Sequence, residues 1–557
     1  MPNLRFLSLS YNHLDGTFPQ FIINCTSLRM SYLDLSINSF SGPIPDSLLD
    51  MAPRLRYLDL YSNGFSGPIP RSLSRLQKLQ SLDLSDNNLT GGIPLLSRLQ
   101  KLQNLNLGAN NLTGGIPEEL GMISGLQTLY LYGNLLGGSI PASLGKLQML
   151  QHLDLGNLTN LEVLELSGNQ LSGSLPSWLA KMHQVAYFDI SGNNLNGIIP
   201  PEIHKWNYLS YLSLSGNSFF GSIPLEVGNM TNLDTLNLSN NRFMGETRSI
   251  FCDLKLLYFV DLSSNQLSGE LMSCIWNLQN LEFLDFSSNA LVGEVPTMAN
   301  NNSSLIYLRL SNNNFTGCFP EVLKNLKNLA EPDIEDLEYE YNGTGLVFYD
   351  EVGIAWKGRD YNFQSVDDLN GIDLSSNSLS GEIPSELTNL RGLRFLNMSR
   401  NYLSGNIPED IGNLAVLESL DLSQNKLSGP IPSSMSDLLS LTYLNLSNNN
   451  LSGEIPTGNQ LRTLSDPSIY SNNLGLCGSP LNACTNHSNS RSTLFVEKDH
   501  HDHETLWLYY TAIAGFVFGF WLWFGALFIC KSRMFALFSS IDSMQDKVVQ
   551  IMKQKHS

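Results

Sequence analysis

The chain has 557 residues, and its 51 acidic and 32 basic side chains give a formal net charge of -19 and a sequence pI near 4.8. This charge argues against a nucleic-acid partner, because phosphate binding needs a basic face. A protein, peptide or glycan is the expected partner. Although this length would ordinarily suggest several globular domains, a fixed internal period favours one continuous solenoid.

The pattern L-x-x-L-x-L-x-x-N recurs along most of the chain, usually every 24 residues. This is a leucine-rich-repeat period, in which each unit gives a short strand and a return segment. The 18 predicted units start at Leu4, Met30, Leu55, Leu79, Leu102, Leu126, Leu150, Leu161, Val185, Leu209, Leu233, Leu257, Leu281, Leu305, Leu369, Leu393, Leu417 and Leu441. They predict repeats over 1–328 and four more over 369–464.

Each unit keeps its inward-pointing residues and varies the residues that line the concave surface. In the unit that starts at Leu393, we expect Leu396 and Met398 to point inward and Asn401 to satisfy buried backbone groups at the turn. The residues between them, such as Phe395 and Asn397, alternate to the other face of the strand and line the concave surface. Substitution there leaves the core intact.

Two features depart from the repeat. The step from Leu150 to Leu161 is only 11 residues, too short for a coil that returns to stack on its neighbour, so we expect a deletion or a gene-model error there. The chain also begins inside a repeat, without an apolar signal segment or a polar cap, which predicts an N-terminally truncated copy.

The predicted lining carries two recurrent columns. The third strand position is often aromatic, which fits either a binding stripe or, more commonly, packing between coils. These aromatic positions are Tyr32, Tyr57, Tyr187, Tyr211, Phe259, Phe283, Tyr307, Phe395 and Tyr443. The fifth position is often aspartate, which we attribute to the consensus L-D-L-S rather than to a basic ligand.

Ligand contacts are expected where the lining leaves this consensus. Tyr61, Tyr130 and Tyr132 do so in the early coils, and Arg309 and Arg400 do so on either side of an interruption of the repeat. Exposed aromatic and arginine side chains are the residues that interface hot spots use most.

The repeat stops over 329–368. Within it, residues 331–368 contain eleven acidic residues against Lys357 and Arg359, a net charge of -9, together with seven aromatic residues. The alternation of Val352, Ile354 and Trp356 predicts a strand that packs on the solenoid. An unstructured acidic linker is the alternative. We include Trp356 and Lys357 among the candidate ligand contacts.

The second half of each unit, as in "LSGNIPEDIGNL", carries the L-x-G-x-I-P signature of the plant-type leucine-rich repeat. The chain resembles plant leucine-rich-repeat receptor-like proteins over nearly its whole length. This resemblance implies an α/β solenoid, a curved superhelix with a parallel concave sheet, followed by one transmembrane helix and a short tail without a kinase. The interruption resembles the island domain of that family, which shapes ligand and co-receptor contacts.

Cysteines and sequons both indicate an extracellular protein. Cys477 and Cys484, in a predicted cap over 465–490, fit a local disulfide, with two buried thiols as the alternative. Cys252 and Cys274 are nearly one period apart and could also pair, while Cys25 and Cys318 have no assigned partner. Of 14 N-x-S/T sequons, about half are expected to be unmodified because the repeat itself generates them. Those expected to carry glycans are Asn88, Asn111, Asn229, Asn314, Asn342 and Asn450.

Residues 506–530 are 25 residues without a charge, enough to cross a hydrocarbon core of about 30 Å as one helix. Trp507 precedes the apolar run and Lys531 follows it, so the aromatic-belt and positive-inside preferences agree on an outside N-terminus. This predicts a single-pass type I protein of the plasma membrane. The acidic juxtamembrane stretch 491–505 contains histidines, which we interpret as solvated rather than as metal ligands.

Thr511, Gly515 and Gly519 recur every fourth residue, a small-xxx-small stripe that lets two membrane helices approach closely. Coincidence is the alternative, because glycine is common in membrane helices. The tail 531–557 is shorter than a small domain of about 50 residues and lacks kinase signatures. The resemblance implies an adaptor receptor-like kinase bound through the membrane helix and a co-receptor kinase at the last repeats.

The sequence therefore predicts a cell-surface receptor that senses an extracellular ligand in defence or development and borrows a kinase. It predicts no enzyme and no cofactor, because no catalytic or metal arrangement occurs in a confirming context. Two alternatives stay open: an extracellular inhibitor of a microbial wall-degrading enzyme, which the apolar segment 506–530 disfavours, and a receptor fragment without function.

Overall fold

A computed structural model describes residues 4–19, 22, 29–47, 53–148, 161–247, 249–296, 304–320, 326, 329, 352–356, 359–363 and 369–484. Of the two hairpin ranges, 352–356 and 359–363, only the backbone is described. Residues 1–484 form one compact unit.

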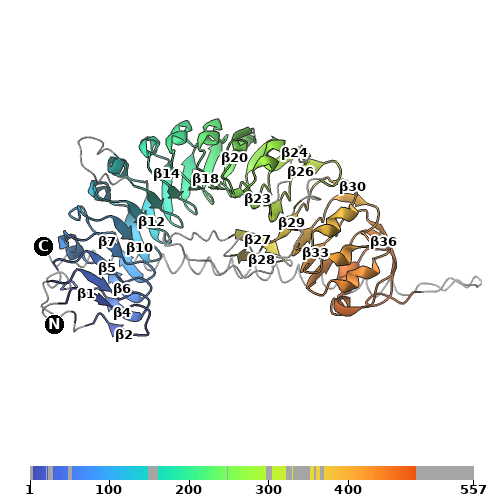
Figure 1. Ribbon diagram of the computed structural model, residues 1–557, viewed down its shortest axis with the longest axis horizontal. Coiled ribbons are helices and arrows are strands. Elements are labelled where there is room, and N and C mark those ends of the chain that lie inside the picture. The colour runs from blue at the N-terminus through green and yellow to red at the C-terminus, as the bar shows by residue number, and fades with distance from the viewer. Residues whose placement is uncertain are drawn as a thin grey trace, which may run out of the picture. The chain divides into compact units, whose positions relative to one another are not determined.

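The main sheet has 17 parallel strands within the described residues, one from each coil. Figure 1 shows its strands, β23 and β29 among them, on the inner side of the curved stack of coils. The strands are β1 (Phe6–Ser8), β3 (Tyr32–Asp34), β5 (Tyr57–Asp59), β7 (Ser81–Asp83), β9 (Asn104–Asn106), β11 (Thr128–Tyr130), β13 (Val163–Glu165), β15 (Tyr187–Asp189), β17 (Tyr211–Ser213), β19 (Thr235–Asn237), β21 (Phe259–Asp261), β23 (Phe283–Asp285), β25 (Tyr307–Arg309), β29 (Gly371–Asp373), β31 (Phe395–Asn397), β33 (Ser419–Asp421) and β35 (Tyr443–Asn445).

A second parallel sheet, which the sequence analysis did not predict, runs beside the first and has 13 strands in the described part of the chain. Its strands are β2 (Asp15–Thr17), β4 (Ser39–Pro43), β6 (Gly64–Pro68), β8 (Asn88–Gly91), β10 (Asn111–Gly115), β12 (Leu135–Gly138), β14 (Gln170–Ser174), β16 (Asn194–Gly197), β18 (Ser218–Gly221), β20 (Arg242–Glu246), β22 (Gln266–Glu270), β24 (Ala290–Glu294) and β26 (Asn314–Thr316). After the interruption, β30 (Ser380–Glu382) pairs with β32 (Tyr402–Ser404), and β36 (Asn450–Glu454) lies between β34 (Ser428–Gly429) and β37 (Gly475–Cys477).

Most described return segments contain a 3-10 helix, while Ile22 is α-helical, so the expected α/β class is correct in its sheet and most return helices are of the 3-10 type. Most begin directly after the proline of the I-P signature, whose φ near -60° and extended ψ start the tight turn at η1 and η6. These helices are η1 (Arg71–Arg75), η2 (Glu118–Met122), η3 (Ala142–Gln148), η4 (Ser177–Lys181), η5 (Pro201–Lys205), η6 (Leu225–Asn229), η7 (Ser249–Phe251), η8 (Ser273–Asn277), η11 (Ser385–Asn389), η12 (Ile411–Asn413), η13 (Ser433–Asp437), η14 (Asn459–Arg462) and η15 (Pro467–Tyr470).

One leucine-rich core runs through all coils, as the repeat predicts. Leu393 and Leu396 are fully buried and Met398 nearly so. The Asn401 amide donates to the carbonyls of Leu374, Met398 and Ser399 at 3.0, 3.3 and 3.2 Å, and its oxygen accepts from the Leu379 amide at 3.0 Å. The asparagine thus satisfies backbone groups of two neighbouring coils, which explains why it cannot vary.

The predicted unit at Leu150 contributes no strand to the described sheet, because β11 pairs directly with β13 in the register Tyr130 with Glu165. Residues 149–160 lie outside the described residues. Of the 18 predicted units, the other 17 each provide one strand.

The sheet passes the interruption without losing register. β25 pairs directly with β29, so Tyr307 lies beside Gly371 and Arg309 beside Asp373. Inside the interruption, β27 (Val352–Trp356) and β28 (Arg359–Phe363) form an antiparallel hairpin. A strand over Val352–Trp356 is therefore confirmed.

No helix in the described part of the chain is long and apolar enough to cross a membrane. The predicted span 506–530, with Thr511, Gly515 and Gly519, lies outside the described residues.

Candidate ligand-binding face

The main sheet exposes one face on which equivalent residues of successive coils form columns. In β5, Leu58 points into the core and is fully buried, whereas Tyr57 and Asp59 point the other way and are half-buried. Register places Asp34, Asp59 and Asp83 side by side on β3, β5 and β7. Because strands are about 4.8 Å apart, each column is a continuous strip of side chains.

The aromatic column stacks on itself, which favours the packing interpretation. Ring centroids are 4.4 Å apart for Tyr32 and Tyr57, and 4.2 Å apart for Tyr187 and Tyr211. The Phe283 ring stacks between those of Phe259 and Tyr307, with centroid distances of 4.4 and 4.8 Å. The flat faces of these rings are therefore occupied by neighbouring coils.

The fifth-position carboxylates have a local structural cause. Each accepts the backbone N–H two residues on, as Asp83 does from Ser85 at 2.9 Å and Asp421 from Ser423 at 2.9 Å. Asparagine does the same in this position, because Asn397 accepts from the Ser399 amide at 3.1 Å. The consensus aspartate thus closes the turn after the strand and by itself says nothing about a ligand.

Burial disfavours the charge of several of these carboxylates. It raises the pKa of Asp59 to about 6, with a further contribution from Asp83 and Asp34. It raises the pKa of Asp189 to about 6. Glu165 has its pKa raised to about 8 by burial and by the neighbouring Asp189. Glu165 was missed at the sequence level, although its glutamate stands where the consensus has aspartate and this departure could have marked it.

Arg309 lies between two of these carboxylates. Its Nη1 is 3.6 Å from Asp285 Oδ2 and its Nε is 3.4 Å from Asp373 Oδ2, and both aspartate side chains are 5% exposed. Nε also donates to Ser311 Oγ at 3.2 Å. The two aspartates raise the pKa of the guanidinium despite its burial. This predicted ligand contact therefore has intramolecular partners.

Burial and neighbouring carboxylates raise the pKa of all three tyrosines predicted in the early coils. After burial, the main charge is Asp86 for Tyr61 and Glu165 for Tyr130 and Tyr132, and Asp83 adds to all three. Tyr61 is the most accessible of the three at 38% exposed. The Tyr132 ring lies across Gly108, where an added Cβ would be 2.3 Å from its Cε1, so the glycine makes room for the ring.

No described contact joins the other predicted ligand-binding residues, Arg400, Trp356 and Lys357, to these tyrosines. Arg400 is exposed in the left-handed region at φ 56°. Trp356 ends β27, whose side chains are not described, and Lys357 lies outside the described residues.

Two disulfides and several sequons lie in the described part. Cys477 is bonded to Cys484, and Cys252 to Cys274 across neighbouring coils. Cys318 is free and exposed, and Cys25 lies outside the described residues. Three sequon asparagines, Asn88, Asn111 and Asn314, occupy the exposed first position of second-sheet strands, and Asn450 occupies the same position in β36. Asn229 is exposed at the end of η6, and Asn342 lies outside the described residues.

Comparison with known families agrees with this architecture. The family described as Leucine rich repeat matches residues 159–219 and 408–451. The single Leucine Rich Repeat unit matches residues 3–25, 54–76, 78–99, 101–123, 125–147, 232–254, 304–326, 368–390 and 392–414. Together these matches cover more than half of the chain. The chain belongs to the leucine-rich-repeat family.

Within this family the chain is similar to plant receptors. It is 51% identical over 215 residues to the Receptor-like protein EIX2 of Solanum lycopersicum, a match that spans 38% of this chain and 21% of that relative. The crystal structure of a TDR receptor matches with a TM-score of 0.67 and 31% identity, covering 80% of this chain and 69% of that one.

A second solved structure is the Arabidopsis receptor kinase HAESA in complex with the peptide hormone IDA and the co-receptor SERK1. It matches with a TM-score of 0.52 and 29% identity, covering 86% of this chain and 87% of that one. This leucine-rich-repeat chain therefore resembles plant receptor ectodomains, including one solved with a peptide.

Proposed function

We propose that this protein is a kinase-less, cell-surface receptor-like protein of the plasma membrane. Its inner sheet recognises an extracellular peptide, protein or glycan, and a partner receptor kinase carries the signal in defence or development. The observation that carries this proposal is the interruption at 329–368, because the sheet on either side of it is continuous.

The fold does not need the inserted segment. β25 and β29 keep their pairing across it, and both Leu329, its first residue, and Leu369, the residue that follows it, are buried. Coils in such an array contact mainly their neighbours, so an insertion between two of them is tolerated without loss of the core. A long segment retained at such a point is best explained by recognition.

The proposed ligand contacts are the accessible departures from the repeat on the inner sheet. Tyr61, Tyr130 and Tyr132 provide partly exposed aromatic surface in the early coils. Arg400 provides an exposed guanidinium two strands after the interruption. We propose that Trp356 and Lys357 add contacts from the inserted segment. Because Arg309 is paired with two aspartates, it would reach a ligand only by exchanging one of them.

The partner kinase is proposed to bind at two places. The first is the stripe of Thr511, Gly515 and Gly519, where small side chains would let an adaptor kinase helix approach closely. The second is the last repeats, where a co-receptor kinase would bind. The similarity to HAESA, solved with a peptide and the co-receptor SERK1, supports the second.

Co-precipitation of the full chain with a receptor kinase from plant membranes tests the proposal. Gly515→Leu with Gly519→Leu should reduce the recovered kinase, because the larger side chains separate the helices. Gly525→Leu, in the same apolar run but off the stripe, is the matched control. If the double variant and the control recover equal amounts of kinase at equal surface level, the adaptor contact is contradicted. If neither the parent chain nor any variant recovers a kinase, the proposed function is contradicted.

A further inference from the structure

The second sheet presents an apolar patch on its exposed side. Large apolar side chains that are 39–55% exposed recur from β16 to β24 and in the adjoining η6. We name them the lateral patch, and they are Ile198, Phe220, Leu225, Met244 and Val292. Large exposed apolar patches on soluble domains mark interaction sites.

The strand registers place a polar side chain beside three of the patch residues. Phe220 on β18 lies beside Arg242 on β20, and Met244 on β20 lies beside Gln266 on β22. Val292 on β24 lies beside Glu270 on β22. The patch therefore alternates apolar side chains with polar and charged ones, and the charged neighbours Arg242 and Glu270 would lie at the polar rim of an interface.

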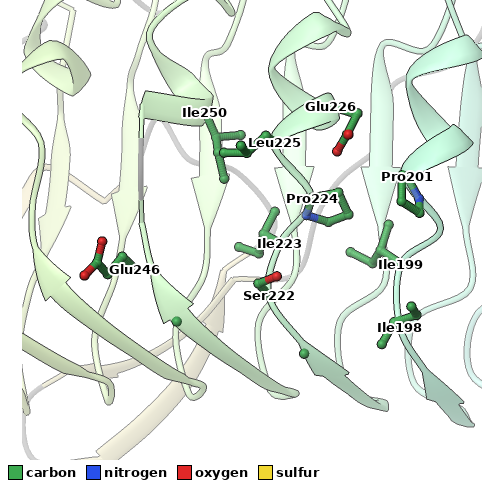
Figure 2. Close-up of a pocket in the computed structure, with 12 residues that line it drawn as sticks. Ile198, Ile199, Pro201, Ser222, Ile223, Pro224, Leu225, Glu226, Glu246 and Ile250 are labelled. Carbon is green, nitrogen blue, oxygen red and sulfur yellow. The ribbon is translucent and has the colours of Figure 1, made fainter.

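A groove of about 500 Å³ adjoins the patch. Figure 2 shows Ile223 at its centre, with Leu225 and Ile250 on one side and Ile199 on the other. Glu226 and Glu246 also line it. Its apolar floor can hold an apolar side chain from a partner, and its carboxylates favour a cation beside that side chain.

A row of carboxylates continues from the groove along the sheet. Glu246, Glu270 and Glu294 end β20, β22 and β24, one exposed carboxylate per strand. Each side chain lies over the glycine of the next strand, as Glu270 Cγ does at 2.9 Å from a Cβ built on Gly293. Like charges at one-strand spacing attract a basic partner.

Sequons at the first strand position lie on either side of the lateral patch, and a further sequon, Asn229, ends η6 four residues after the patch residue Leu225. In β8, β10, β26 and β36 the exposed first residue is a sequon asparagine. From β14 to β24 the first residues are Gln170, Asn194, Ser218, Arg242, Gln266 and Ala290, and none begins a sequon. The same structural position can therefore carry a glycan on both sides of the lateral patch but not within it.

We propose that the lateral patch and its groove form a docking surface for an extended segment of a partner protein, with apolar side chains followed by lysine or arginine. The apolar side chains fill the groove over Ile223, and the basic ones lie on Glu270 and Glu294. From β16 to β24 is four strand spacings, about 19 Å, which about six residues of extended chain can cover. This surface belongs to a different sheet from the inner face, so its test is independent of the function proposed above.

Glycan insertion tests the surface with one matched pair of variants. Gln266→Asn creates the sequon Asn-Leu-Ser in the middle of the lateral patch, at the strand position that Asn314 occupies in β26. Gln170→Asn creates the same tripeptide in β14, outside the patch. Both place a glycan where the fold already accepts asparagine, so both variants of the full chain should reach the cell surface at the parent level when expressed behind a cleavable secretion signal.

The probe is a fluorescein-labelled peptide, Leu-Gly-Leu-Gly-Arg-Gly-Arg, followed by fluorescence anisotropy on the purified full chain. We expect Gln266→Asn to weaken its binding by at least about tenfold, as loss of an interface hot spot does, whereas Gln170→Asn binds like the parent chain. Trimming the glycan with an endoglycosidase should restore binding. Binding should also weaken, and depend less on salt, in the double variant Glu270→Gln with Glu294→Gln. The same result is expected when citrulline replaces arginine in the probe.

Several results would overturn the proposal. One is equal binding by the two glycan variants when mass spectrometry shows both sites occupied. Others are equal binding of the arginine and citrulline peptides, and no binding of either to the parent chain. A change in oligomeric state with Gln266→Asn in the absence of the probe would assign the surface to a second copy of this chain instead.

Discussion

Replacing Arg309 by methionine separates a structural role from a ligand-binding one. The substitution keeps the length of the side chain and removes the guanidinium that lies 3.6 Å from Asp285 and 3.4 Å from Asp373. Removing one partner of a buried pair costs about 3–5 kcal/mol, because the other charge is left uncompensated. This cost applies in full only while the carboxylates stay ionised.

At low pH, protonation of Asp285 reduces the cost of losing Arg309. Burial and the nearby Asp261 raise the pKa of Asp285 to about 7, although Arg309 lowers it. Without Arg309 this pKa rises further. A carboxyl whose folded pKa lies above its unfolded value costs stability as the pH rises through that window. We therefore expect Arg309→Met to cost about 1–2 kcal/mol at pH 5, mainly from the lost hydrogen bond to Ser311 and lost packing, and about 3–5 kcal/mol at pH 8.

Urea denaturation of the full chain at both pH values measures this difference as a shift of the midpoint. Arg400→Met is the control, because Arg400 is exposed and makes no ion pair with the described residues. The reasoning is refuted if Arg309→Met loses the same unfolding free energy at pH 5 and at pH 8, or loses no more than the control variant does. Arg309 would then be available for a ligand.

Three further predictions concern single features. Glu165→Gln should have a thermal midpoint close to that of the parent chain near pH 4 and exceed it by a margin that grows as the pH rises toward 8, because the unfolded carboxyl ionises near its ordinary value of about 4.3 while the folded one, whose pKa is about 8, stays protonated; a difference that does not change with pH would contradict this. Asn401→Ala should cost about 2–4 kcal/mol by leaving buried backbone groups unsatisfied, and should speed amide exchange at Leu379; unchanged exchange would argue against the asparagine ladder. The full chain, recovered from plant cell membranes after expression behind a cleavable secretion signal, should run above its polypeptide mass of 61.9 kDa and return to that mass on deglycosylation.

The inner sheet could be predicted strand by strand from the period. The unit that starts at Leu4 gave β1, and the unit at Leu441 gave β35. This worked because inward leucines and the turn asparagine recur at a fixed spacing and leave one register for each coil. The unit at Leu150 lies in residues 149–160, outside the described residues, and the strands on either side of it, β11 and β13, pair directly.

The second sheet and the environment of Arg309 could not be predicted in the same way. Strands such as Asn88–Gly91 are short and rich in glycine and polar residues, and they form because each coil places them beside the equivalent strand of the previous coil. Asp373 becomes a neighbour of Arg309 only because the sheet closes across the interruption. Both features depend on contacts between coils, and these contacts cannot be inferred from the sequence of a single repeat.

The deletion of residues 331–368, which joins Ala330 to Leu369, tests the central claim most directly. β25 and β29 already pair across this segment, so the shortened chain should fold and reach the cell surface at the normal level. The measurement is phosphorylation of the co-precipitated receptor kinase in plant cells exposed to an extracellular peptide extract. The account predicts that the intact chain raises it and that the deletion abolishes the rise. An equal rise with both chains, or none with the intact chain, would contradict recognition through the interrupted solenoid.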